Sequence, residues 1–263
     1  MPKKEKLKKS PQTISVYFIL RFLVIVCMVG QSMRGNWNNV FLCILTLILF
    51  TLPMLISKKF NIKLPTTLEI IVYLFIFAAE ILGEIQNFYG IFQHWDTMLH
   101  TLNGFLAAAV GFSLIDILNR TETFHISLTP AFVALVSFCF SMTIGVLWEF
   151  GEFALDRYLL TDGQKDRIVT TISSKEIGNK QENEKIIIKD INKTVIYSEG
   201  NQKTYTIDDG YLDIGLIDTM KDLFVNFIGA IVFSILGLLY IKDRDEYKFA
   251  ERFIPILKKL KEE

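Results

Sequence analysis

The feature that most constrains the fold is a series of long apolar segments. A helix of about 20 apolar residues crosses the hydrocarbon core of a bilayer. Six segments of roughly this length lie at residues 14–31, 39–57, 66–86, 96–118, 130–157 and 217–241. The chain is also 51% hydrophobic, which is too apolar for an ordinary soluble domain. We therefore predict an all-α polytopic membrane protein, built as a six-helix transmembrane bundle.

The polar segments between and beyond these spans divide the rest of the chain. Residues 1–13 form a basic tail, and residues 158–216 form the one long insert, between spans five and six. Within the insert, "KTVIYSEG" and "QKTYTI" are rich in β-branched residues, and Glu199-Gly200-Asn201 predicts a hairpin turn between them. We expect a small β-rich insert. Residues 242–263 predict a short amphipathic surface helix, with its apolar side formed by Phe249, Phe253, Ile256 and Leu257.

The short loops differ in their content of basic residues. Lysines are concentrated in the N-terminal tail, in the 57–65 loop and in the C-terminal tail. The 32–38 loop has only Arg34, and the 87–95 loop has no Lys or Arg. Because short loops rich in Lys and Arg stay in the cytoplasm, we expect both termini to be cytoplasmic and the insert to be extracytoplasmic.

Charge and cysteine content exclude some classes of function. The formal net charge is zero, so nothing indicates a nucleic-acid partner. Cys27, Cys43 and Cys139 all lie within apolar segments. They are typical of small core residues rather than of disulfides or a cysteine metal site.

The last four spans share an unusual feature, which is a set of polar side chains at one end of each span. An ionisable group at the bilayer centre costs at least about 2.5–3.5 kcal/mol, and such groups normally face a bundle interior. The spacings of three and four put the groups of each span on one helix face, and the helical rise puts all four sets at a similar depth in the outer half. The sets are Glu80 and Glu84; Asp96, His100 and Asn103; Glu149, Glu152 and Asp156; and Asp218, Asp222 and Asn226.

These groups form a hard, oxygen-rich set with one imidazole. Such a set suits Mg²⁺, Mn²⁺ or Ca²⁺, with Zn²⁺ open through His100. A cation or shared protons must balance so many carboxylates. The candidate ligands are Glu80, Glu84, Asp96, His100, Glu149, Asp218 and Asp222, and the candidate acids or bases are His100, Glu149 and Glu152. Simpler interpretations remain: Asp96, Asp156 and Asp218 as interfacial carboxylates, and Asn103 and Asn226 as structural hydrogen-bond partners between helices.

Three kinds of function are compatible with this pattern. The first is a metal-assisted hydrolase or transferase that acts on an envelope lipid or a lipid-linked substrate. The second is a proton- or cation-coupled transporter, since transporters use similar chains of ionisable residues. The third is a non-catalytic envelope protein that binds a partner through its insert. Membrane lipids are the expected surroundings in each case, and nothing in the sequence fixes an oligomeric state.

Three motifs carry a family resemblance. "WDTMLHTLNG", "LWEFGEF" and "DTMKDLFVNFIGA" resemble, in this order, motifs of the VanZ-like membrane proteins and more closely of the YjdF-type bacterial inner-membrane family. This chain has Thr97 where the VanZ-like pattern usually has Lys, and Glu152 where it often has Gln. The insert, residues 158–212, lies outside the resemblance. The resemblance implies a multi-pass protein of the bacterial plasma membrane, and it does not supply a reaction.

Overall fold

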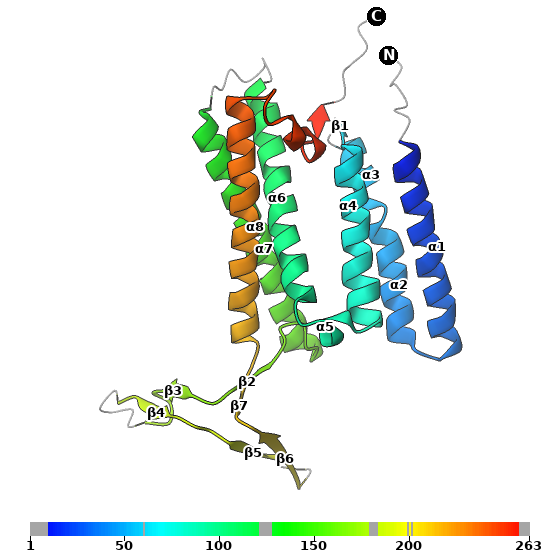
Figure 1. The fold of residues 1–263 in the computed structure, drawn as a ribbon. Helices are drawn as coiled ribbons and strands as arrows, with labels where there is room; N and C mark the ends of the chain where they lie inside the picture. The colour runs from blue at the N-terminus through cyan, green and yellow to red at the C-terminus, as the bar shows by residue number, and fades with distance from the viewer. Residues whose placement is uncertain are drawn as a thin grey trace, which may run out of the picture. The chain divides into compact units, whose positions relative to one another are not determined.

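The structure is a computed structural model. It describes residues 10–59, 61–120, 128–178, 184–198, 200 and 202–257. The chain divides into two compact units, one holding residues up to Gly145 and from Phe224 onward, the other running Val146–Leu223. Both boundaries between the two units fall within long helices (Figure 1).

Within the described residues, five helical stretches are long and apolar enough to cross a membrane. Four are single helices: α1 (Pro11–Met33), α6 (Trp95–Arg120), α7 (Pro130–Leu159) and α8 (Leu216–Lys242). The fifth runs Trp37–Lys59 and is made of α2 (Trp37–Leu49) and α3 (Leu52–Lys59). The predicted class, a helical membrane protein, is confirmed.

The span expected at residues 66–86 is not a uniform α-helix. It consists of α4 (Thr66–Phe77) followed by a π-helix, η1 (Ala78–Ile85). A π-helix bonds each N–H to the carbonyl five residues earlier; it is a rare structure, and it is frequently found at functional sites. The short helix α5 (Phe88–Ile91) follows. Trp95, at the start of α6, donates from its indole Nε1 to the Ala78 carbonyl at 3.3 Å, and this bond ties the π-helix to the next span.

The first unit contains two apolar clusters. One is formed where α1, α2 and α4 pack together, and it buries Leu20, Cys43 and Tyr73 (Figure 1). The other is formed mainly by α6, α7 and α8, with Phe112 and Phe233 among its fully buried side chains. All three cysteines are free thiols. Cys43 is a buried core residue as predicted, whereas Cys27 is partly buried and Cys139 is exposed.

Two glycines set the distance between α6 and α8. A Cβ atom at Gly104 would overlap the carbonyl oxygen of Asn226, and one at Gly229 would overlap the carbonyl oxygen of Thr101. The hydroxyl of Ser141, on α7, donates to the Gly104 carbonyl at 2.7 Å. Small residues and hydroxyl hydrogen bonds are the usual means of close helix packing in membranes, so α8 has little freedom to shift along α6.

The segment after α8 differs from the predicted surface helix. It forms a five-residue 3₁₀-helix, η2 (Lys248–Arg252), and then a strand, β8 (Ile256–Leu257), which pairs antiparallel with β1 (Ile62–Lys63). Phe249 and Ile256 are exposed, whereas Phe253 is buried with its ring centroid 5.1 Å from that of Phe105 on α6. The segment therefore does not form the predicted helix with a single apolar face. Its Phe253 packs against α6, and its Ile256 lies in the strand that pairs with β1.

The second unit holds the predicted β-rich insert. Its strands form three antiparallel pairs: β2 (Arg167–Val169) with β7 (Tyr211–Asp213), β3 (Ile172–Ser174) with β4 (Ile186–Ile188), and β5 (Lys193–Ser198) with β6 (Lys203–Asp208). The β5–β6 pair confirms the predicted strands, with Ser198 opposite Lys203. Glu199 and Asn201 of the expected turn lie outside the described residues.

Candidate functional site

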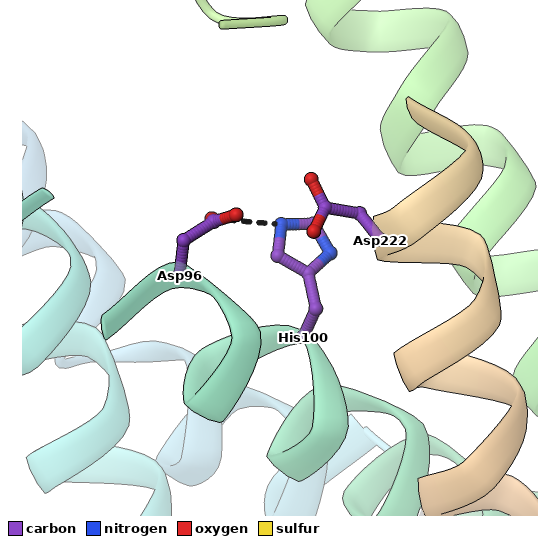
Figure 2. Close-up of side chains that lie close together, drawn as sticks. All are labelled: Asp96, His100 and Asp222. Atoms are coloured by element: carbon purple, nitrogen blue, oxygen red, sulfur yellow. Dashed lines mark ion pairs between the residues drawn. The ribbon is translucent and has the colours of Figure 1, made fainter. Parts of the chain in front are cut away.

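The first two turns of α6 carry an ion pair between Asp96 and His100. The two residues are four apart, so a helix places them on one face. The His100 Nε2 lies 3.4 Å from Asp96 Oδ1, and the two side chains are 13% and 22% exposed. Figure 2 shows the imidazole standing beside the carboxylate. The pair is therefore shielded from solvent but still accessible to a small ligand.

One helical turn further along α6, Asn103 makes a hydrogen bond to α8. Its Nδ2 donates to Oδ1 of Asn226 at 3.2 Å, and Asn226 is only 1% exposed. Together with the glycine contacts, this bond fixes the rotation of α8 about its own axis. It therefore decides which residues on the preceding turn of α8 face α6.

Asp222 lies one turn before Asn226 on the same continuous helix and is 2% exposed. One ligand atom from each of Asp96, His100 and Asp222 lies within 4.8 Å of the others (Figure 2). We call these three residues the carboxylate–histidine group. Among the residues that the structure describes, this is the one set of three such side chains close enough to share an ion.

The other predicted ligands do not belong to this group. Glu80 and Glu84 both lie on the π-helix, where Glu80 is partly buried and Glu84 is exposed. Glu149 is 4% exposed on α7. Glu152 accepts a 2.7 Å hydrogen bond from the indole of Trp148. That these polar residues lie at the same end of their spans was predictable from hydropathy. Which three of them come together depends on the rotation of the helices.

Asp218 has a structural role in the second unit. Its Oδ1 lies 2.7 Å from Nη2 of Arg167, and its Oδ2 accepts from the backbone N–H of Lys165 at 2.9 Å. Both oxygens of this predicted ligand are thus used to join the start of the insert to the first turn of α8. Sequence reasoning missed Arg167, because its partner lies far away along the chain.

Asp156 completes this junction from the end of α7. Its carboxylate accepts from Thr161 Oγ1 at 2.6 Å and from the backbone N–H groups of Gly163 and Gln164 at 2.6 and 2.7 Å. A carboxylate that accepts several such bonds holds a loop in a single conformation. Two of the carboxylates near the span ends therefore organise the insert.

The carboxylate–histidine group has a clear electrostatic requirement. Two carboxylates beside one imidazole carry negative charge in a partly buried place. Nζ of Lys221 lies 4.0 Å from Asp222 Oδ1, and a protonated His100 or a bound cation would add to this compensation. One nitrogen and two oxygen ligands fit Mn²⁺ or Zn²⁺, and Mg²⁺ less closely. With three protein ligands, a bound cation would keep coordination positions open for water or a substrate oxygen.

Another buried carboxylate lies towards the other end of α6. Asp116 is 5% exposed, and its Oδ1 is 3.1 Å from Nη2 of Arg244, just beyond α8. The guanidinium also lies over the ring of Tyr240, 4.9 Å from its centroid. This carboxylate pairs with an arginine away from Asp96 and His100, whereas Oδ1 of Asp222 lies 4.0 Å from Nζ of Lys221 and a ligand atom of Asp222 lies close to Asp96 and His100.

The fold defines the class of protein. Apolar helices long enough to cross a bilayer, with ionisable side chains gathered where helices begin, are the features of a polytopic helical membrane protein. The chain belongs to the DUF2238 family, whose description is "predicted membrane protein", and the match covers residues 14–243. The matched region includes the insert. Membership bears out the expected membrane-protein family, while the narrower VanZ-like and YjdF-type resemblance stays a prediction.

A curated relative matches part of the chain. An uncharacterized protein of Thermotoga maritima is 26% identical over 107 residues, which is 41% of this chain. The chain spans about half the length of that relative, 53% of it. No solved structure matches the chain.

Proposed function

We propose that this protein binds a divalent cation at Asp96, His100 and Asp222, and that it acts as a hydrolase or transferase on a lipid-linked substrate of the bacterial envelope. The observation that carries the proposal is the carboxylate–histidine group, whose ligand atoms lie within 4.8 Å of one another. In this proposal the protein resides in the bacterial plasma membrane with its termini in the cytoplasm. The group then faces the outer leaflet.

Each residue of the group would have a distinct part. Asp222 is almost fully buried and would supply a fixed anionic ligand, whereas Asp96 and His100 are partly exposed and border the open side. With a cation bound, the neutral His100 imidazole and a carboxylate oxygen of Asp96, which lie 3.4 Å apart in the structure, would both be ligands. A bound cation would polarise a phosphoryl or carbonyl oxygen, or lower the pKa of a bound water. Glu149 and Glu152 remain the proposed acid and base, together with His100 where it is not a ligand.

Transport is the competing proposal, and it calls for a polar route through the bundle. Beyond the asparagine pair, Ala108, Ala109 and Phe112 of α6 and Phe233 of α8 are fully buried apolar residues. This packing favours a site that works from one side of the membrane. Cation flux in vesicles that exceeds the flux in protein-free vesicles would support transport instead. The VanZ-like and YjdF-type resemblance belongs to the same proposal, because it supports an envelope role.

The test is the thermal response of Asp222→Asn to metal. Asn keeps the shape of Asp222 but removes its charge, which relieves repulsion among the carboxylates when no metal is bound. We expect the variant to match or exceed the wild-type Tm in a chelator. We also expect it to lose the rise in Tm that Mn²⁺ or Zn²⁺ gives the wild type, since a ligand stabilises only the state that binds it.

Asp116→Asn is the matched control, because the same substitution is made on a buried carboxylate that pairs with Arg244. It should keep the full metal response. A full metal response in Asp222→Asn would remove Asp222 from the site. If the wild type itself responds to none of Mg²⁺, Mn²⁺, Ca²⁺ and Zn²⁺, proton sharing replaces the metal as the better account.

A further inference from the structure

A pocket of about 440 Å³ lies beside the second half of α1. One wall is formed by α1 from Leu23 to Arg34, and the other by the end of α4 and the π-helix from Phe77 to Leu82. The eleven steps from Leu23 to Arg34 correspond to about 16 Å along a helix axis. The pocket is therefore elongated along the helices, in the direction that an acyl chain takes in a bilayer.

The pocket opens to the side, along the surface of α1. Leu23 and Val26 line it and are nevertheless 43% and 53% exposed. The neighbouring side chains Phe22 and Val29 are also exposed, at 65% and 52%. An apolar helix surface of this kind, in a membrane protein, faces hydrocarbon. The pocket is thus accessible from the lipid phase.

The chemistry of the lining changes along the pocket. The part along the helices is apolar, with Val26, Phe77 and Ile81, whereas the part at the helix ends has Gln31, Arg34 and Gln86. Arg34 is the charged residue of this lining and follows directly after α1. The oxygen of the Gln31 amide accepts from Asn39 Nδ2 at 3.3 Å, which leaves its nitrogen as the donor.

We propose that this pocket binds an anionic glycerophospholipid, with an acyl chain along the apolar walls and the phosphate at Arg34. An apolar stem that ends in an anion complements an apolar pocket that ends in a guanidinium, and arginine is well suited to phosphate. The proposal needs no metal and shares no residue with the carboxylate–histidine group. An experiment on this pocket therefore tests it independently of the proposed function.

Gly30 provides a direct way to fill the pocket. It lines the pocket, and a Cβ atom added there would meet no atom within 4 Å. Gly30 is inside a helix with ordinary helical backbone, where most residues are more favourable than glycine. Gly30→Leu should therefore fold while its side chain occupies the space of the acyl chain. Gly151→Leu, on α7, places the same side chain into equally open space outside the pocket.

The experiment is a titration of the purified full chain, in an uncharged detergent, with short-chain phosphatidylglycerol or phosphatidylcholine while Tm is followed. The wild type should bind phosphatidylglycerol about fivefold more tightly than phosphatidylcholine, the effect of one arginine on an anionic lipid. Arg34→Gln should remove this preference. Gly30→Leu should lose the response to both lipids, and Gly151→Leu should keep it.

Three results would overturn the proposal. These are equal binding of the two lipids by the wild type, an undiminished preference in Arg34→Gln, and an undiminished response in Gly30→Leu. Arg34 is exposed, so Arg34→Gln still tests the phosphate contact if the leucine variant unfolds.

Discussion

Gly229 illustrates how much depends on single residues in this protein. The nearest atoms to a Cβ at this position are the carbonyl oxygen of Thr101 and the backbone nitrogen of Phe105, and neither can rotate away as a side chain can. A larger residue must therefore push α8 away from α6. The Asn103–Asn226 hydrogen bond lies within one turn of the same contact.

We predict that Gly229→Ala lowers the Tm of the purified protein, at a cost of about 1–3 kcal/mol for overpacking. It should also weaken the metal-induced shift, because Gly229 is two turns along α8 from Asp222. Gly151→Ala is the control, because its Cβ would meet open space, and better helix propensity should leave Tm unchanged or higher. Equal Tm values for the two variants would show that α6 and α8 can separate without cost.

The candidate residues were only partly predictable from the sequence. Helical spacing alone places Asp96 and His100 on one face, and hydropathy places Asp222 at the matching end of another span. Which carboxylates meet depends on helix rotation, which is set by contacts such as Gly229 with Thr101 and Asn103 with Asn226. Gly104 and Gly229 allow the close approach of α6 and α8, but their positions in the sequence do not reveal how the two helices are rotated.

At the scale of elements, the junction between the insert and its two helices is held by several side-chain hydrogen bonds and an ion pair. Asp156 and Asp218, one on each helix, hold residues 161–167 by hydrogen bonds and by the Arg167 ion pair. The carboxylate of Asp218 is 4% exposed while the Arg167 side chain is 46% exposed. Removing the arginine charge would therefore leave a buried anion with less compensation.

We predict that Arg167→Gln loosens this junction by about 1–2 kcal/mol, less than for a fully buried pair because Arg167 is half exposed. Limited proteolysis should then cleave the loop between α7 and β2 faster than in the wild type. Lys193→Gln, an exposed change on β5, should leave the cleavage rate unchanged. Unchanged cleavage in Arg167→Gln would mean that the hydrogen bonds of Asp156 are sufficient to hold the loop.

Helices and strands that follow from a local pattern in the sequence were predicted well. Elements that depend on contacts with distant parts of the chain were predicted poorly. The membrane helices follow from apolar length, and the β5–β6 pair follows from its β-branched residues. The π-helix has no such signal in "AAEILGEI". Its stability comes from partners elsewhere, such as the Trp95 bond to the Ala78 carbonyl and the packing of Tyr89 against Gly83. The pairing of β1 with β8 is likewise a long-range contact.

At the scale of the whole molecule, orientation in the membrane determines which compartment the carboxylate–histidine group serves. The distribution of Lys and Arg in the short loops predicts that the insert is outside and that the segment after α8 is inside. The charge pattern supports this orientation, and a labelling experiment tests it directly.

We predict that Ser173→Cys, exposed on β3, reacts with a membrane-impermeant maleimide in intact cells when Cys27, Cys43 and Cys139 are replaced by serine or alanine. Glu246→Cys, exposed beyond α8, should react only after permeabilisation. The opposite pattern would invert the topology. It would place the group, and any substrate, on the cytoplasmic side.

The pairing of β1 with β8 has a consequence for biogenesis. Strand β1 precedes α4, whereas β8 follows α8, so the two strands can pair only after the whole of α8 has been synthesised. The β1–β8 pair therefore forms late, and both strand edges are unpaired in a chain that stops before β8. A cell could distinguish finished from unfinished copies by the exposed strand edge alone, since an unpaired edge is the kind of surface that chaperones and proteases engage.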